Sequence, residues 1–322
     1  MADKRRAGPV AAPPSAPATR RDHGLASDPM PAYSANPLLA IGLMCLATAL
    51  FSCLDATAKF LVVKAELPAT QVVWVRFMSQ FLLIVVVLGA VSVPRLLATT
   101  QLKHQMLRSV LMLASTVFNF LALQHLRLDQ TSTIYFLTPL MVALLAGPFL
   151  GEWVGWRRLV AIMIGFAGIL VAIRPGFTDV HYAVIFSLVS MVAYTGFILL
   201  TRHLSRFDPV EVTLFYSLLA GAYGMAPFAL VDWVWPAGWL HWTLLASLGV
   251  WGGIGHYLLI IAHRYAPAST IAPFIYVSLL THSVLGFLVF QDVPDRWTLA
   301  GAAVVIGAGL YLLHRERVTR AR

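Results

Sequence analysis

The chain has 322 residues, of which 59% are hydrophobic and 11% are charged, and its formal net charge is +9 at pH 7. With a mean hydropathy of +0.78, it carries more apolar surface than one soluble core can hide, which excludes an ordinary soluble domain. The charge does not indicate a nucleic-acid partner, because the basic residues lie between apolar runs and at the chain ends instead of in one continuous patch. The composition predicts a polytopic protein of the lipid bilayer.

The first 36 residues are rich in Pro, Ala and Arg and contain no apolar core. They lack the central region of a signal peptide and the makings of a fold, so residues 1–36 are expected to form a disordered cytoplasmic tail. Beyond them, runs of roughly 20 apolar residues predict an all-α membrane protein. Its ten transmembrane helices are expected at residues 38–63, 70–92, 108–126, 131–150, 157–174, 181–201, 210–231, 242–263, 268–290 and 297–314, and a basic cytoplasmic tail follows at 315–322.

The distribution of Lys and Arg between the loops predicts the orientation. With the N-terminus in the cytoplasm, 17 basic residues fall on the cytoplasmic side and 4 on the opposite side, and the intramembrane Lys59 and Arg76 complete the total of 23. This asymmetry predicts that both termini are cytoplasmic.

The first apolar run contains an acid and a base one helical turn apart, Asp55 and Lys59. A charge near the middle of the bilayer costs roughly 2.5 to 3.5 kcal/mol on insertion scales, so such residues usually face a protein interior or a wet cavity. The order of the two, acid first and base four residues later, favours attraction on one helix face. The two residues form either a structural pair or part of a transport path.

Arg76, in the second apolar run, lies at a similar depth to Asp55, roughly 9 to 12 Å below the outer surface at about 1.5 Å per residue. The short loop at residues 64–69 makes the two helices antiparallel neighbours, so Arg76 is expected to fork onto the Asp55 carboxylate. This pair is either a clamp of the helix hairpin or a substrate or gating site.

The chain also repeats itself. Arg127 and Ser132-Thr133-Ile134 recur 137 residues later as Arg264 and Ser269-Thr270-Ile271, and Pro68 recurs as Pro209 at a spacing of 141. These matches predict two repeats of five helices, residues 37–176 and 177–314. Because five is odd, the second repeat enters the membrane from the opposite side. Inverted repeats are typical of secondary transporters, whose substrate site lies near the midplane between the halves.

Four short motifs occur in order along these spans: Phe51-Ser-x-x-Asp55-x-x-x-Lys59, Trp74-Val-Arg76-Phe77, Thr138-Pro139 and Leu150-Gly151-Glu152. With the span count and the duplication, residues 38–314 resemble the EamA-domain transporters of the drug/metabolite transporter superfamily. The second half departs from the pattern, with Tyr276 and Gln291-Asp292 where the proline-containing and Gly-Glu signatures are expected.

This resemblance implies a secondary active transporter of a small polar organic metabolite in a bacterial-type inner membrane, working by alternating access. The first-helix pattern is similar to bacterial members that import riboflavin or S-adenosylmethionine. The alternative is an exporter of amino acids or of other metabolites or drugs.

Further polar residues on the predicted helices can line one cavity with Asp55, Lys59 and Arg76: Asn119, Tyr135, Thr138, Ser190, Tyr194, His256, Tyr257, Tyr276 and His282. Each alone is more often a helix–helix hydrogen bond or an interface anchor than a ligand. The tyrosines offer both a stacking face and a hydroxyl. They therefore predict a planar, polar substrate such as a flavin-like vitamin.

Catalytic motifs such as a Gly-x-Ser-x-Gly elbow, a His-Glu-x-x-His helix or a phosphate-binding loop do not occur in the sequence. We therefore expect no enzyme activity, cofactor or metal. The rival classes are an intramembrane enzyme, which needs Asp55 to converge with His256 or His282, and a channel. Small residues at Gly301, Gly307 and Gly309 predict close helix contacts, either within the chain or at a homodimer face.

Overall fold

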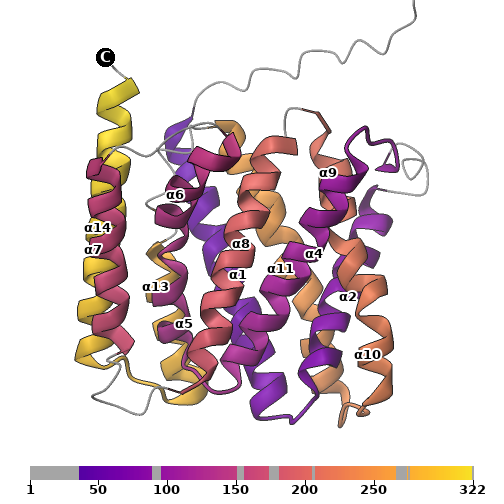
Figure 1. Ribbon diagram of the computed structural model, residues 1–322. Coiled ribbons are helices and arrows are strands. Elements are labelled where there is room, and N and C mark those ends of the chain that lie inside the picture. Colours follow the sequence, from indigo (N-terminus) through magenta and orange to yellow (C-terminus); the bar gives the residue numbers. More distant parts are fainter. Residues whose placement is uncertain are drawn as a thin grey trace, which may run out of the picture. The chain divides into compact units, whose positions relative to one another are not determined.

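The computed structural model describes residues 36–88, 96–150, 156–173, 181–204, 207–265, 274 and 276–320, and within them the regular structure is helical (Figure 1). The predicted tail therefore lies, apart from Asn36, outside the described residues, as do Gly151 and Glu152. In chain order the elements are α1 (Pro37–Val63), α2 (Ala69–Leu88), α4 (Leu102–Leu123), α5 (Leu128–Tyr135), α6 (Thr138–Leu150), α7 (Trp156–Ile173), α8 (Ala183–Leu204), α9 (Val210–Leu219), η1 (Ala220–Gly224), α10 (Ala226–Val231), α11 (Trp239–Tyr265), α13 (Val277–Leu285), η3 (Gly286–Phe290) and α14 (Arg296–Arg320).

Each of the ten predicted spans coincides with one helix or with an interrupted helix, which confirms the all-α fold. Five segments are long and apolar enough on their own to cross a membrane, namely Leu38–Val63, Ala69–Val87, Leu102–Leu123, Ala183–Thr201 and Glu211–Val231. Shorter apolar helices cover Leu159–Ala172 and Val277–Phe290. At the C-terminal end, α14 continues to Arg320 through residues expected to form a tail.

Three spans predicted as continuous helices are interrupted in the structure. The fourth breaks between α5 and α6, where Pro139 has no N–H to donate to the carbonyl of Tyr135. The seventh and ninth contain short π-helices, η1 and η3. Such π segments are rare and occur frequently at functional sites.

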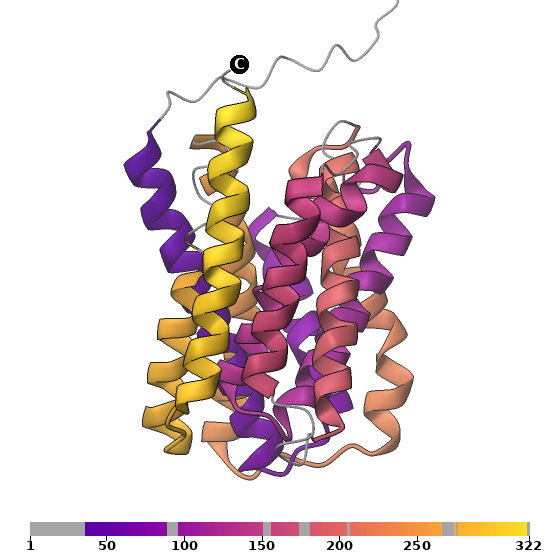
Figure 2. The same cartoon turned by 60° about the vertical axis from the view of Figure 1, so that its left-hand side comes forward.

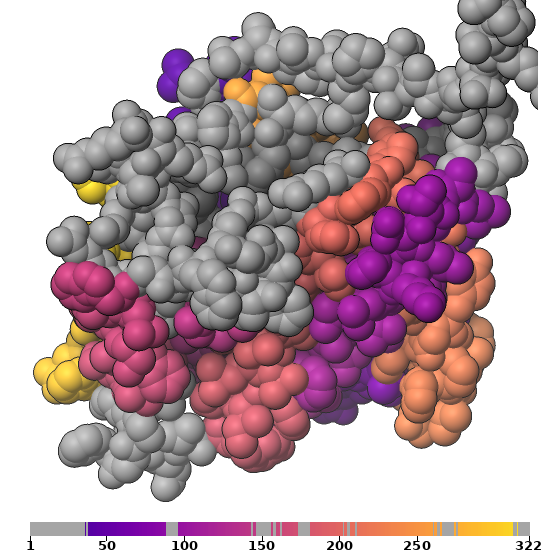
Figure 3. Space-filling view, turned by 45° about the horizontal axis from the view of Figure 1, so that its top comes forward, coloured from indigo at the N-terminus to yellow at the C-terminus, as the bar shows by residue number. Residues whose placement is uncertain are grey.

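The two repeats are interleaved. The most extensive helix pairs are α1 with α11, α7 with α14, and α4 with α8, and each pair joins the first repeat to the second. Figure 2 shows α7 and α14 side by side, and Figure 3 shows α4 and α8 adjacent on one face. Exchanging every helix for its counterpart five spans away converts the α1–α11 pair into α8–α4 and leaves α7–α14 unchanged. The packing thus has the symmetry expected of two inverted five-helix repeats.

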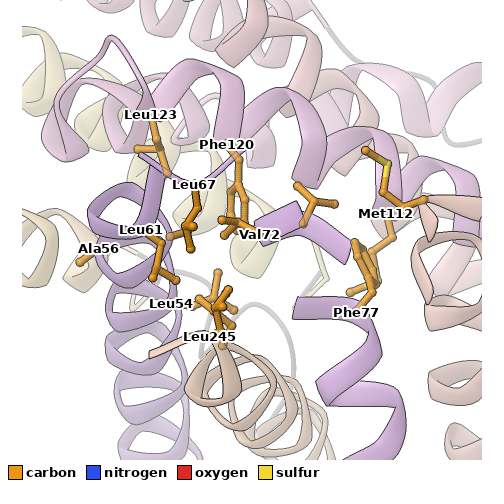
Figure 4. Close-up of a cluster of buried hydrophobic side chains, with 14 of the residues drawn as sticks. Leu54, Ala56, Leu61, Leu67, Val72, Phe77, Met112, Phe120, Leu123 and Leu245 are labelled. Carbon is orange, nitrogen blue, oxygen red and sulfur yellow. The ribbon is translucent and has the colours of Figure 1, made fainter. Parts of the chain in front are cut away.

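A hydrophobic core fills the space between α1, α2, α4 and α11. Leu54, Leu61, Phe77, Phe120 and Leu245 belong to it, and all are at least 96% buried (Figure 4). Many large apolar side chains point outward instead, which suits a protein surrounded by lipid because lipid tails do not penalise apolar surface. The start of α1 and the end of α14 lie at the same end of the bundle (Figures 1 and 2).

Two of the three glycines singled out on the last helix make contacts within the chain. A Cβ on Gly301 would lie 2.5 Å from the Gly168 carbonyl oxygen, and one on Gly309 would overlap the Tyr276 hydroxyl. Gly307 has no heavy atom within 4 Å of its Cβ position among the described residues. Of the three, Gly307 alone is left as a candidate for the predicted homodimer contact.

Candidate functional site

A cavity of about 170 Å³ lies between helices of both repeats. It is lined from α1, α2, α4, α5, α8, α11 and α13. Its walls combine polar groups with several aromatic rings. The lining residues are Thr48, Phe51, Leu54, Asp55, Arg76, Met112, Ser115, Thr116, Asn119, Phe120, Thr131, Ser132, Tyr135, Phe136, Tyr194, Phe197, His256, Ser278 and His282.

Asp55 is held by one residue from each repeat. Its Oδ1 accepts a hydrogen bond from Asn119 Nδ2 at 3.0 Å, and its Oδ2 lies 3.3 Å from His282 Nε2. About a quarter of its side chain is exposed, which leaves carboxylate surface toward the cavity. The Asp55 carboxylate is therefore held in one orientation and remains partly accessible from the cavity.

His282 has an acceptor on each side of its ring. Its Nδ1 lies 2.9 Å from the Ser278 carbonyl oxygen and 3.2 Å from Ser52 Oγ, and its Nε2 lies 3.3 Å from Asp55 Oδ2. The ring therefore connects α13 of the second repeat to two residues of α1 in the first.

Arg76 lines the same cavity but does not fork onto Asp55, which corrects the prediction. Its Nη1 donates to Thr116 Oγ1 at 3.0 Å, and no carboxylate oxygen of the described residues lies within the 4.0 Å of an ion pair. Arg76 as a residue is 95% buried, and its Nε has no hydrogen-bond partner in the described part of the chain. Asp55 and Arg76 both line the cavity, and each is hydrogen-bonded to other residues.

The position of Arg76 depends on the π-helix η1. Trp74 Nε1 donates to the Ala222 carbonyl at 2.8 Å, which satisfies an acceptor within η1. The ring of Phe77 covers Gly221 so closely that a Cβ there would overlap it. Trp74 and Phe77 together dock α2 on η1 on either side of Arg76, which explains why the Trp-Val-Arg-Phe segment matters structurally.

Two tyrosines form an aromatic wall of the cavity. The Tyr135 hydroxyl is hydrogen-bonded to Ser190 and lies 3.3 Å from Ser115 Oγ. The ring centroids of Tyr135 and Tyr194 are 5.8 Å apart, and Tyr194 stacks on Phe197 at 5.8 Å with an interplanar angle of 17°. The opposite wall carries His256, whose ring lies 4.9 Å from that of Phe51.

Five predicted site residues do not line the cavity, and one of them, Ser190, is buried and hydrogen-bonded to the Tyr135 hydroxyl. Lys59 is turned away from Asp55, because its Nζ contacts Asp292 Oδ2 at 3.2 Å and the Leu126 carbonyl at 3.0 Å. Thr138 is buried outside the cavity, and Tyr257 is 59% exposed on the outer surface. Tyr276 packs edge-on against Phe136 with centroids 5.0 Å apart, behind the cavity wall.

Sequence reasoning missed Arg108, which it placed at the cytoplasmic end of a span. The residue is 96% buried inside α4 and donates to Thr201 Oγ1 at 2.7 Å, to the Thr213 carbonyl at 3.0 Å and to Ser217. Its guanidinium also lies 4.2 Å from the Phe197 ring. The hydropathy pattern missed it because the apolar run was started at Arg108 itself, six residues after α4 begins.

The convergence required by the enzyme hypothesis is present, since a carboxylate and an imidazole meet at Asp55 and His282. The third group beside them is the Ser52 hydroxyl, 3.2 Å from His282 Nδ1. Ser52 is fully buried and donates to the Thr48 carbonyl, so it presents no nucleophile to the cavity.

Comparison with known proteins supplies the family. The profile of the EamA-like transporter family matches residues 38–174 and 181–314. The chain is 27% identical over 191 residues to the S-adenosylmethionine uptake transporter of Rickettsia felis, a match that spans 59% of this chain and only 65% of the relative. It is 27% identical over 276 residues to the riboflavin transporter of Vibrio cholerae, covering 84% of this chain and 91% of the relative.

An exporter is among the relatives as well. The pseudopaline exporter of Pseudomonas aeruginosa is 28% identical over 278 residues, covering 84% of this chain and 95% of the relative. A crystal structure of another protein superposes with a TM-score of 0.62 at 19% identity, over 87% of this chain and 98% of the other, which supports the fold alone.

Proposed function

The chain belongs to the EamA-like transporter family, and we propose that it is a secondary active transporter of a small polar organic metabolite. The proposal rests above all on the cavity, which is lined by both interleaved repeats. A site shared by two inverted repeats can be exposed to either side of the membrane when one repeat moves against the other. Alternating access is therefore the mechanism that this arrangement supports.

The lining of the cavity supports an organic substrate. Ligand sites are largely apolar with a few placed polar groups, and here aromatic rings surround Asp55, Arg76 and Asn119. Tyr135 and Tyr194 can hold a planar group, which an inorganic ion does not require. At about 170 Å³ the cavity is smaller than the roughly 300 Å³ at which typical ligand pockets begin, so a nucleoside-sized substrate requires it to widen.

The named relatives give two directions of transport. Import of S-adenosylmethionine follows from the name of the first relative, riboflavin as a transported compound follows from that of the second, and export of a metabolite follows from that of the third. We favour import, because the motif of the first helix is similar to that of importers and the Rickettsia felis relative is named as an uptake transporter.

We place the protein in a bacterial inner membrane with both termini in the cytoplasm. Support comes from the 17 to 4 distribution of basic residues and from the common end of the bundle at which α1 starts and α14 ends. Reporter fusions after residues 36 and 318 should both report a cytoplasmic location. An exported reporter at either position contradicts the topology.

Transport is tested with the purified full chain reconstituted in liposomes. Radiolabelled riboflavin and S-adenosylmethionine are offered in separate assays, with and without a proton gradient, and saturable uptake of at least one compound is expected. Protein-free liposomes and liposomes with heat-denatured protein are the controls. Non-saturable flux that rises linearly with concentration indicates a channel, and chemical alteration of the recovered compound indicates an enzyme.

A further inference from the structure

The charges that face the cavity do not cancel in pairs. The titratable side chains in its wall are Asp55, Arg76, Tyr135, Tyr194, His256 and His282. Lys59, one turn away, is compensated by Asp292 outside the cavity. The balance inside it therefore depends on Asp55, on Arg76 and on the two histidines.

Asp55 is the one carboxylate among the lining residues, and other groups already hold both of its oxygens. Asn119 Nδ2 lies 3.0 Å from Oδ1, and His282 Nε2 lies 3.3 Å from Oδ2. Asp55 therefore forms no ion pair with Arg76.

Arg76 consequently has no ion-pair partner among the described residues, and Asp55 contributes its charge from elsewhere in the cavity wall. A guanidinium stays protonated in proteins and offers five donors in a planar fork. Thr116 Oγ1 takes one of them, and Nε is buried without a partner among the described residues. Burying a charge without a partner is costly, so an arginine left in this state marks a place where an anion is to arrive.

A second buried cation raises the positive potential nearby. In the described part of the chain the acceptors of Arg108 are neutral, and its guanidinium lies against Phe197, which is itself part of the cavity wall. His256, also in the wall, is 9% exposed and has no carboxylate within 4.0 Å in the described part of the chain. These neighbours favour a negative group at Arg76 over a neutral one.

Resting on the function proposed above, we infer that the transported substrate carries a carboxylate and that Arg76 is its anchor. The two oxygens of a carboxylate match the guanidinium fork, and a carboxylate supplies the ion pair that Arg76 lacks among the described residues. The remainder of the substrate lies against Tyr135 and Tyr194. Between the two import candidates, this favours a substrate with an amino-acid head group, such as S-adenosylmethionine, over riboflavin, which has no carboxylate.

The test uses thermal unfolding of the purified full chain with matched compounds. S-adenosylmethionine is compared with its decarboxylated form, L-tryptophan and L-methionine with their amides, and riboflavin serves as a carboxylate-free ligand. A ligand that binds only the folded state raises its apparent stability. We expect at least one carboxylate compound to protect, and its amide or decarboxylated partner to bind at least tenfold more weakly.

Substitutions of Arg76 test whether this residue is the source of the preference for a carboxylate. Arg76→Gln should abolish the preference for the carboxylate over its masked partner, and Arg76→Lys should retain a reduced preference because the charge remains without the fork. Arg127→Gln, at the end of the bundle, is the matched control and should keep the full preference. If Arg76→Gln does not fold, the comparison of compounds on the unmodified protein still decides.

The inference and the proposed function fail in different ways. Equal protection by a carboxylate and its amide, or protection and uptake of riboflavin without any carboxylate compound, removes the anchor and leaves the transporter. An absence of protection and of uptake for every compound counts against both.

Discussion

Lys59 Nζ lies 3.2 Å from Asp292 Oδ2 and ties α1 of the first repeat to the segment that follows η3 of the second. The pair sits one helical turn beyond Asp55 toward the end of α1 at Val63, away from the end at which α14 finishes. Lys59 also donates to the Leu126 carbonyl, and Phe290 covers it with the ring centroid 4.7 Å away. This contact fastens the two repeats together at one end of the bundle.

Removing one member of this pair should destabilise the protein more than removing both. Asp292→Asn leaves a buried ammonium with a single carbonyl partner, so we expect a loss of about 1 to 3 kcal/mol in the free energy of unfolding. Lys59→Met together with Asp292→Asn should cost less than the sum of the single changes.

Denaturation of the four proteins in detergent measures this coupling. Glu66→Gln, an exposed change in the turn after α1, is the control and should stay within about 0.5 kcal/mol of the parent. Strict additivity in the cycle means that the two side chains do not interact.

Asp55→Asn should reduce uptake at least tenfold while the amount of protein in the membrane stays normal. The amide keeps the shape of the carboxylate, but it removes the negative charge and one of the two acceptor oxygens that face Asn119 and His282. Cys53→Ala, a change on the same helix at a residue outside the cavity wall, should leave uptake unaltered. Full uptake by Asp55→Asn assigns the residue to helix packing alone.

Gly301→Ala should weaken the contact between α14 and α7. A methyl group there meets the Gly168 carbonyl oxygen at 2.5 Å and the Ala172 Cβ at 2.6 Å, and such overpacking typically costs about 1 to 3 kcal/mol. Gly307→Ala, on the same helix with open space around the Cβ position, is the matched control. Comparison of their unfolding temperatures checks the packing, and equal values contradict it.

The ratio of monomer to dimer in the same two variants tests the remaining dimer hypothesis. If Gly307 lies at a homodimer face, Gly307→Ala should shift the equilibrium measured by analytical ultracentrifugation, whereas Gly301→Ala should not. An unchanged equilibrium in Gly307→Ala excludes this glycine from a dimer contact.

The loop histidine His125 should contribute a pH dependence to stability. Burial, and then the positive charge of His181 stacked 4.5 Å away, lower the pKa of His125 below its ordinary value. As the pH falls below about 6.5, the unfolded chain takes up this proton before the folded protein does, so the free energy of unfolding decreases. Above that pH both states are neutral at His125 and the contribution is constant.

His125→Gln should therefore lose less stability between pH 7.5 and pH 5.5 than the parent does. Tyr182→Phe removes only the hydroxyl that contacts His125 at 3.2 Å and should retain the parental pH dependence. An identical pH profile in His125→Gln and in the parent shows that this histidine is not the source.

Local pattern predicted the helices well, and it predicted long-range partners poorly. The hydropathy runs located all ten spans, and charge at mid-membrane depth singled out Asp55 and Arg76, which both reach the cavity. The expected partners were wrong because spacing along one helix or one hairpin cannot show that Asp55 meets His282, 227 residues away, or that Lys59 meets Asp292, 233 residues away.

The helix interruptions differ in whether the sequence contains a residue that predicts them. Pro139 marks the break between α5 and α6 and could have been used to predict it. The π-helix η1 has no such signal, since it is recognised only through Trp74 and Phe77 packing on it from another helix. Arg108 was missed because a charged residue at the edge of an apolar run is ordinarily assigned to the loop.

The interleaved packing sets the order of events during synthesis. The principal partner of α1 is α11, which begins at Trp239, 176 residues after α1 ends at Val63. At about 5 to 20 residues per second, a ribosome needs on the order of 10 to 35 s to produce that partner. Throughout this interval the first helix, with Asp55 and Lys59 both lacking their counterparts from the second repeat, must be accommodated by the insertion machinery or by lipid. A chain interrupted between the repeats would be left in that state permanently, so the ancestral duplication survives here as a single cooperative unit and no longer as two separable ones.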